Sequence, residues 1–123
     1  MKRIILEIGT GNDLYGEDYT KAACRAVDDA LHHSLIILFR SLGYDHADME
    51  VRVTIAVQAP EKVDTAVVAA KLPRGKAVVT AVKGGLNVVD PEHATCSVIA
   101  TAAVEAWLDV DADEWVVGNS TAP

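Results

Sequence analysis

Apolar patterns of two different periods alternate along this chain, and this alternation constrains the fold more than any other feature. Residues 49–59 carry an apolar side chain at every second position from Val51 to Val57, which is the pattern of a half-buried strand. Residues 18–42 carry apolar side chains three or four positions apart, which is typical of an amphipathic helix. A short apolar run at Arg3–Ile8 predicts a first strand. We therefore expect strands and helices to be interleaved.

Capping and turn residues set the expected limits of these elements. Asp18 or Thr20 is the predicted N-cap of the first helix, which should end at the glycine of residues 42–43. Residues 61–72 predict a second helix. Residues 76–89 predict a β segment in which two glycines form either a bulge or a hairpin turn.

The last third of the chain is rich in alanine. An Asp-Pro pair at 90–91 and the apolar line through Val98 and Ala102 predict a third helix that ends near Leu108. Residues 114–118 predict a final short strand.

Taken in order, these elements predict a single α/β (α+β) domain over residues 1–118, with a flexible tail at 119–123. It should contain one sheet of four to five strands, with three helices packed mainly on one face. Because the chain is 50% apolar but 5% aromatic, its core should consist mainly of Val, Ala, Ile and Leu. One sheet face would remain uncovered, so we expect a homo-oligomer.

Charge and hydropathy exclude several classes of protein. The net charge of -7 and the lack of a Lys/Arg cluster argue against nucleic-acid binding. The longest uncharged apolar run, at 35–39, is far shorter than the ~20 residues that span a bilayer, and the N-terminus lacks signal-peptide features. We therefore expect a cytoplasmic protein. Cys24 and Cys96 form no CxxC motif and are interpreted as helix-packing residues.

A glycine-rich segment, Gly9–Gly16, is the first candidate site, and we expect it to be a loop. Its pattern GxGxDxYG fits neither GxGxxG nor a P-loop, and Asp13 and Glu17 would repel phosphate. It is either a structural turn or a site in which Asp13 acts as a general base or polar anchor. Arg25 would be a nearby cation, which pairs either with Asp13 or with Asp29 one helical turn away.

A second candidate site is Lys83 with Gly84, Gly85 and Asn87. The lysine would bind a carbonyl or carboxylate group in a cleft, or it would be an ordinary strand-face lysine. Ser97, expected on the third helix, would be a nucleophile only with a base such as Lys83. The four histidines show no metal-ligand spacing, so we expect no metal and no cofactor. They are His32, His33, His46 and His93.

Three segments together resemble one known family: GTGNDLYG (9–16), DYTKAACRAVDDA (18–30) and MEVRVTIAV (49–57). With VKGGLNV (82–88), they identify the chain as similar to the Lin0512 family, a group of small uncharacterised proteins. The family signature is GxGxDxHG, and Tyr15 stands here in place of its histidine. The resemblance carries over no established activity.

In layout, such small α/β units are similar to the ring-opening amidohydrolases of the cyanuric acid hydrolase and barbiturase type, and to YjgF-type trimers. This similarity implies a trimer or a multiple of one, with small polar molecules bound between subunits. Asp13 would be the proton acceptor, Tyr15 a hydrogen-bond donor, and Arg25 or Lys83 would bind carbonyls. The glycines expected to line the ligand are Gly9, Gly11, Gly16, Gly84 and Gly85. The alternative is a non-catalytic ligand-binding or structural oligomer in which Gly9–Gly16 is only a turn.

Overall fold

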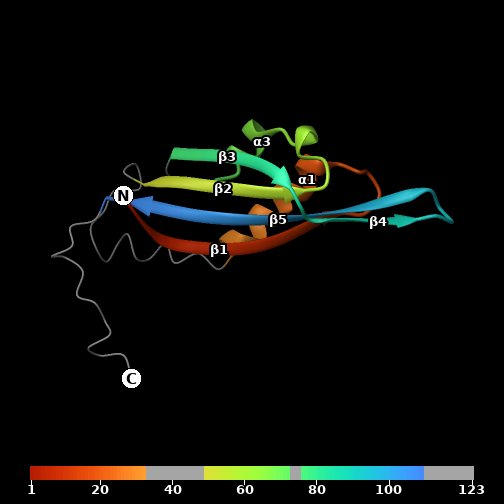
Figure 1. Cartoon of the computed structure of the whole chain (residues 1–123), viewed down its shortest axis with the longest axis horizontal. Coiled ribbons are helices and arrows are strands. Elements are labelled where there is room, and N and C mark those ends of the chain that lie inside the picture. The colour runs from red at the N-terminus through yellow and green to blue at the C-terminus, as the bar shows by residue number, and fades with distance from the viewer. Residues whose placement is uncertain (33–48, 73–75, 110–123) are drawn as a thin grey trace, which may run out of the picture.

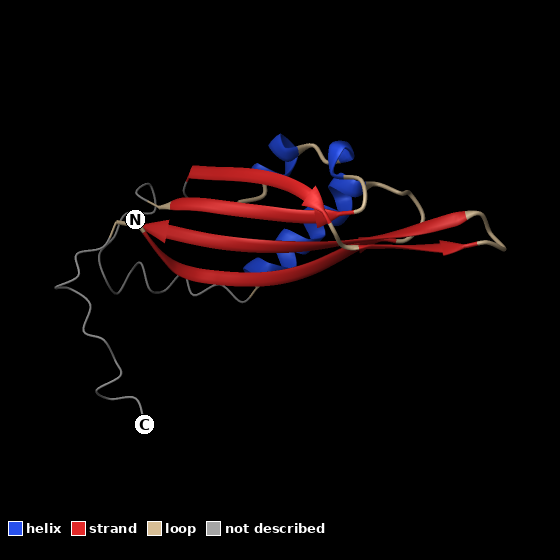
Figure 2. Cartoon of the chain, in the orientation of Figure 1, coloured by secondary structure: helices blue, strands red, loops and turns tan. Residues whose placement is uncertain are grey.

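The computed structural model describes residues 1–32, 49–72 and 76–109. In chain order, its elements are β1 (Lys2–Asp13), α1 (Tyr19–Leu31), β2 (Glu50–Val57), the 3-10 helix η2 (Pro60–Lys62), α3 (Thr65–Ala69), β3 (Lys76–Lys83), β4 (Leu86–Asp90) and β5 (Thr95–Leu108). The strands form one five-stranded sheet, and α1 and α3 pack against it (Figures 1 and 2). The fold is therefore of the mixed α+β class, as expected.

The long strand β5 lies at the centre of the sheet, whose order is β1-β5-β2-β3. It pairs antiparallel with β1 on one side and with β2 on the other, and β3 pairs parallel with β2. Consequently β1, β2 and β3 run in the same direction and end at the same edge. Past the end of β2, β4 takes its place beside β5: Ala56 is opposite Thr101, and Leu86 is opposite Ile99.

The core lies between one face of the sheet and the helices. The central strand and α1 both contribute small side chains to it. The buried residues of these two elements include Val98, Ala100, Ala102, Val104, Ala106 and Leu108 of β5, and Ala22, Ala23, Ala26, Val27 and Ala30 of α1. Small residues let the helix axis approach the sheet closely, so the expected Val- and Ala-rich core is confirmed.

The opposite face of the four strands β1, β5, β2 and β3, which we call the open face, is formed by the side chains that alternate with those of the core. Because α1 and α3 contact each other and pack on the core side, neither helix covers it, and Figure 1 shows α1 behind β1 and β5. Four large aliphatic side chains of the open face are between 40% and 53% exposed. They are Leu6, Ile8, Val78 and Val82.

The prediction of a third helix is wrong, because residues 95–108 form the strand β5. The segment reads as a helix because alanine favours helices, but its buried residues recur at every second position. Pairing with β1 and β2 on both sides overrides that local preference. Ser97 and Cys96 therefore lie on a strand, whereas Cys24 is buried in α1 as expected. Burial raises the pKa of the Cys24 thiol.

Several predicted limits also change. The second helix is broken into η2 and α3, because Asp64 begins a new helix by accepting hydrogen bonds from the N–H groups of Ala66 and Val67. The glycines 84–85 form neither a bulge nor a hairpin: they carry the chain from β3 beside β2 to β4 beside β5. The first helix begins after Asp18, one of its two predicted caps. Its predicted end at 42–43, the strand 114–118, the boundary at 118 and the tail 119–123 lie outside the described residues.

None of the helices within the described ranges is long and apolar enough to cross a membrane.

Candidate functional site

Two of the predicted catalytic residues lie at the edge where the three parallel-running strands end. Asp13 is the last residue of β1, and Lys83 is the last residue of β3. The crevice at the carboxyl ends of strands is where ligands bind in many α/β sheets. However, β5 and β2 lie between the two strands, so Asp13 and Lys83 are separated by about 14 Å across the sheet at ~4.8 Å per strand. A small ligand would not bridge them within one chain.

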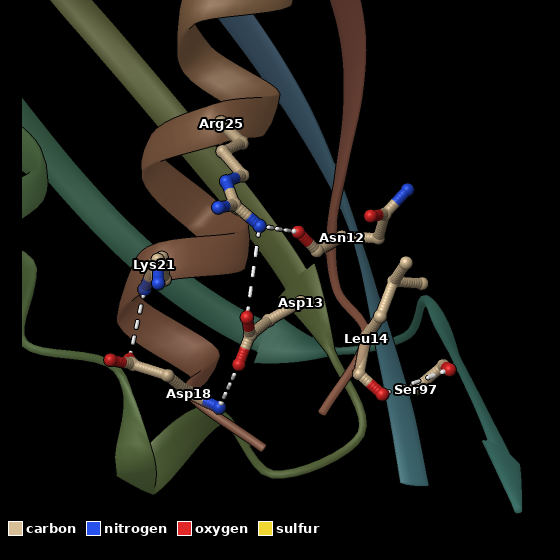
Figure 3. Close-up of polar contacts among 7 residues, drawn as sticks. All are labelled: Asn12, Asp13, Leu14, Asp18, Lys21, Arg25 and Ser97. Carbon is tan, nitrogen blue, oxygen red and sulfur yellow. Dashed lines mark hydrogen bonds and ion pairs between the residues drawn. The ribbon is translucent and has the colours of Figure 1, made fainter. Parts of the chain in front are cut away.

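The Asp13 carboxylate is buried and held by two groups of the following segment (Figure 3). Its Oδ2 accepts a hydrogen bond from the backbone N–H of Asp18 at 2.9 Å, and its Oδ1 lies 3.7 Å from Nη1 of Arg25. Its side chain is 9% exposed. A buried carboxylate must be paired or hydrogen-bonded to offset the loss of hydration. These contacts therefore hold the turn between β1 and α1 closed.

The turn itself is shorter than expected, because β1 continues to Asp13 and only residues 14–18 connect it to α1. Glu17 has a positive φ of 51°, and a Cβ at Gly16 would lie 2.8 Å from Oδ2 of Asp13. Gly16 therefore leaves room for the carboxylate. Asp18 then caps α1, because its Oδ1 accepts a hydrogen bond from the N–H of Lys21 at 3.0 Å.

Gly9 and Gly11 are strand residues that face α1, which corrects the expectation that they lie in a ligand-binding loop. A Cβ at Gly9 would lie 2.3 Å from the Ala26 oxygen, and one at Gly11 would lie 2.3 Å from the Ala26 nitrogen. Helix backbone already occupies the space on that side of the strand. These two glycines therefore serve the close approach of β1 and α1.

The side chains of α1 also hold the outer edge of β1. Arg25 donates from Nη1 to the Asn12 carbonyl oxygen at 2.6 Å, and Oδ2 of Asp29 accepts the Thr10 N–H at 3.0 Å. Of the two predicted partners of Arg25, the structure selects Asp13 over Asp29. The Arg25 side chain remains 49% exposed, so part of its guanidinium group faces solvent. Satisfied backbone groups on an edge strand disfavour the addition of another strand there.

Tyr15 and the second glycine pair do not join this arrangement. The Tyr15 side chain is 80% exposed, so it is not packed on the buried Asp13 carboxylate. The Gly84 N–H donates to the Val57 oxygen at 2.9 Å, and Gln58 Nε2 donates to the oxygens of Gly84 and Gly85 at 3.0 and 3.3 Å. Gly85 has a φ of 62°, and a Cβ there would meet the Ile99 oxygen at 2.3 Å. The pair therefore has a structural role at the crossing to β4.

Two residues near this edge, Tyr19 and Lys62, were not among the predicted site residues, and Tyr19 contacts Asn87 of the second candidate site. Nδ2 of Asn87 donates to the Tyr19 hydroxyl at 2.7 Å, and Nζ of Lys62 lies 5.6 Å from the centre of the Tyr19 ring. The buried Oδ1 of Asn87 has no hydrogen-bond partner among the described residues. Asn87 and Asp13 both lie opposite Val98, on its two sides. The detectable signal was a polar side chain at a core-facing position of a strand, but its partner is 68 residues away.

The remaining candidates are dispersed. Ser97 donates its hydroxyl hydrogen to the Leu14 oxygen at 3.3 Å, and Lys83 is exposed. His93 Nδ1 lies 2.8 Å from Oδ2 of Asp90, whereas His33 and His46 lie outside the described residues. Among the residues that the structure describes, no three His, Cys, Asp or Glu side chains are placed to hold a metal ion.

Comparisons with known proteins agree with this fold but supply no activity. The profile of the family described as "Conserved hypothetical protein (Lin0512_fam)" matches residues 3–106. The crystal structure of an FtsZ-like protein of unknown function from Nostoc punctiforme is similar, with a TM-score of 0.78 and 36% sequence identity. That match covers 89% of this chain and 97% of the other. No curated protein matches the chain.

Proposed function

Since the chain belongs to the Lin0512 family of conserved hypothetical proteins, we propose its function from geometry: it is the subunit of a homo-oligomer that associates through the open face. The observation that carries this proposal is the apolar character of a sheet face that no described helix covers. In this function the turn at residues 14–18 is structural. The protein would serve as an oligomeric scaffold, and any ligand site would depend on neighbouring subunits.

The distribution of apolar side chains supports this proposal. An antiparallel sheet that faces water on one side normally alternates apolar and polar residues. Here Leu6 and Ile8 on β1 and Val78 and Val82 on β3 are apolar and 40–53% exposed on the side that would be polar. These side chains lie on the two outer strands, with β5 and β2 between them, and exposed apolar patches on a protein surface mark interaction sites.

The charged residues of the open face are also arranged for burial. Arg52 donates to the Glu50 carboxylate, with 2.7 Å between its Nη2 and Oε2, and its guanidinium lies 4.2 Å from the centre of the Trp107 ring. Arg3 and Glu105 form a second pair at 3.4 Å. Charges that are already paired lose less hydration energy when a partner covers them. This end of the face can therefore enter an interface together with its apolar part.

Matched substitutions test the proposal. Ile8→Lys places a charge on the open face, where the side chain is 53% exposed, so the subunit should fold but not associate. Val67→Lys on α3 is the control, because Val67 is 46% exposed on the helix side. Size-exclusion chromatography with light scattering should give an oligomer for the wild type and Val67→Lys, and a monomer for Ile8→Lys. A wild type that is monomeric at micromolar concentration, or equal masses for both variants, would refute the proposal. The trimer, or multiple of one, implied by the similarity of layout stays a prediction that this experiment also measures.

A second candidate function rests on Arg25. Its guanidinium group is held by the Asn12 oxygen and remains half-exposed, so it is positioned to bind the carbonyl or carboxylate of a small polar molecule. The finer form, a ring-opening amide hydrolase with Asp13 as proton acceptor, has weaker support because that carboxylate already holds the turn. Arg25→Gln should abolish a thermal shift given by a small dicarboxylate or cyclic imide, and a shift that survives the substitution would exclude this site.

A further inference from the structure

The hairpin of β4 and the first five residues of β5, which we call the arm (residues 86–99), projects beyond the rest of the sheet (Figure 1). Its turn is held by Asp90, whose Oδ1 accepts the Glu92 N–H at 3.0 Å, and Ala94 there has a φ of 52°. β1 and β2 stop pairing with β5 at Val98 and Thr101, so the outer part of the arm is a two-stranded ribbon. Such ribbons are marginally stable on their own.

Successive side chains of the arm project alternately on its two sides. Val88 is opposite Ser97 and Leu86 is opposite Ile99, so both project on the same side as the open face. Val89 projects on the other side, the side of Val98. All three aliphatic side chains are exposed, at 54% for Leu86, 48% for Val88 and 66% for Val89. Leu86 and Val88 therefore add exposed aliphatic side chains to the arm on the same side of the sheet as the open face.

We propose that the arm is part of the interface between copies of this chain, with Leu86 and Val88 packed against a second copy. This inference rests on the proposed function, because it extends the same surface. The partner is a second copy because Leu86 and Val88 project on the same side of the sheet as the face by which the subunits associate. Contact with the partner would give the two-stranded ribbon the packing that it lacks in a single chain.

The size of the open face supports this extension. Four strands about 4.8 Å apart, each with about eight residues at ~3.3 Å, present roughly 500 Å² in projection. A stable interface of standard size buries about 800 Å² on each partner. The arm, with two strands of about five residues, adds roughly 150 Å² of projected area, which does not include the extra area of protruding side chains. The arm brings the face closer to the size of a stable interface.

Neighbouring residues on opposite sides of the arm provide a matched test. Val88→Lys should raise the dissociation constant of the oligomer at least tenfold in sedimentation equilibrium, because it places a charge in the contact. Val89→Lys, one residue away on the other side, should leave the constant unchanged. Val88→Thr keeps a β-branched side chain and should weaken association to a lesser extent, so it tests the contact even if the lysine variant does not fold. Circular dichroism verifies the fold of each variant.

The outcomes separate this inference from the proposed function. One outcome is that the wild type associates, Ile8→Lys dissociates it, and neither Val88 variant changes the dissociation constant. In that case the inference about the arm is wrong, and the open face alone forms the interface. If the two lysine variants weaken association equally, the assignment to one side of the arm is wrong. A monomeric wild type would overturn the proposed function and this inference with it.

Discussion

Replacing Gly11 with alanine is expected to destabilise the protein severely, although it adds only a methyl group. The new Cβ would lie 2.3 Å from the Ala26 nitrogen and 2.5 Å from the Ala22 oxygen. Both atoms belong to the backbone of α1, so no side-chain rotation relieves the overlap. Ordinary van der Waals contact begins at 3.4 Å, and α1 must therefore move away from β1 by about 1 Å.

The magnitude follows from the packing that this movement disrupts. Overpacking a core costs about 1–3 kcal/mol, and occasionally more. A gap of about 1 Å elsewhere along α1 would forfeit up to half of the dispersion attraction of the side chains that line it. We expect a loss of about 3 kcal/mol in the free energy of unfolding, at the upper end of the range, because helix and sheet must both shift. At roughly 4 °C per kcal/mol for a domain of this size, Tm should fall by about 12 °C.

Thermal and urea unfolding followed by circular dichroism, at one fixed protein concentration, measures this loss. Thr10→Ala is the control, because Thr10 is the preceding residue of β1 and its exposed side chain points away from α1. Its backbone hydrogen bond to Asp29 is retained. The control should lose no more than about 1 kcal/mol, the span of strand propensities. A Gly11→Ala variant as stable as the control would show that the close approach of β1 and α1 is not required.

Two further predictions concern the aspartates at two turns, Asp13 before α1 and Asp90 in the arm. Asp13→Asn should lower the free energy of unfolding by about 1–2 kcal/mol, because the hydrogen bond from the Asp18 N–H to a charged oxygen becomes one to a neutral oxygen. An unchanged free energy of unfolding in urea would mean that the carboxylate is not structural. The hydrogen bond from His93 lowers the pKa of Asp90 in the folded state. The ionised Asp90 therefore stabilises the fold at pH values above the unfolded pKa of about 3.9, and this stabilisation is lost as the pH falls through the folded pKa. His93→Ala should raise the pKa of Asp90 towards that of an ordinary Asp carboxyl, and an unchanged carboxyl titration by NMR would contradict this cause.

Features set by local physics were predictable from the sequence. The alternation at residues 49–59 placed β2, and short polar residues before an amphipathic run offered Asp18 or Thr20 as the cap of α1, of which Asp18 is the cap. The segment of β5 was not, because alanines that alternate on a central strand carry the same local preference as a helix. Only the neighbouring strands β1 and β2 decide between the two states.

The candidate site shows the same division. The glycine and aspartate pattern of residues 9–16 allowed a turn to be predicted there. Arg25, the ion-pair partner of Asp13, lies only 12 residues away in the sequence. The roles of Gly9 and Gly11 were not readable, since a glycine that admits a ligand and one that admits a helix look identical in sequence. The contact between Tyr19 and Asn87 joins residues 68 positions apart and depends on the crossing from β3 to β4.

Sedimentation velocity of the wild-type protein over a range of micromolar concentrations tests most directly whether the open face is an interface. A species at a multiple of the 13.1 kDa chain mass, converted to one chain by Ile8→Lys, is the predicted result. A single 13.1 kDa species at every concentration would contradict the central claim that this apolar face is covered by other copies of the chain.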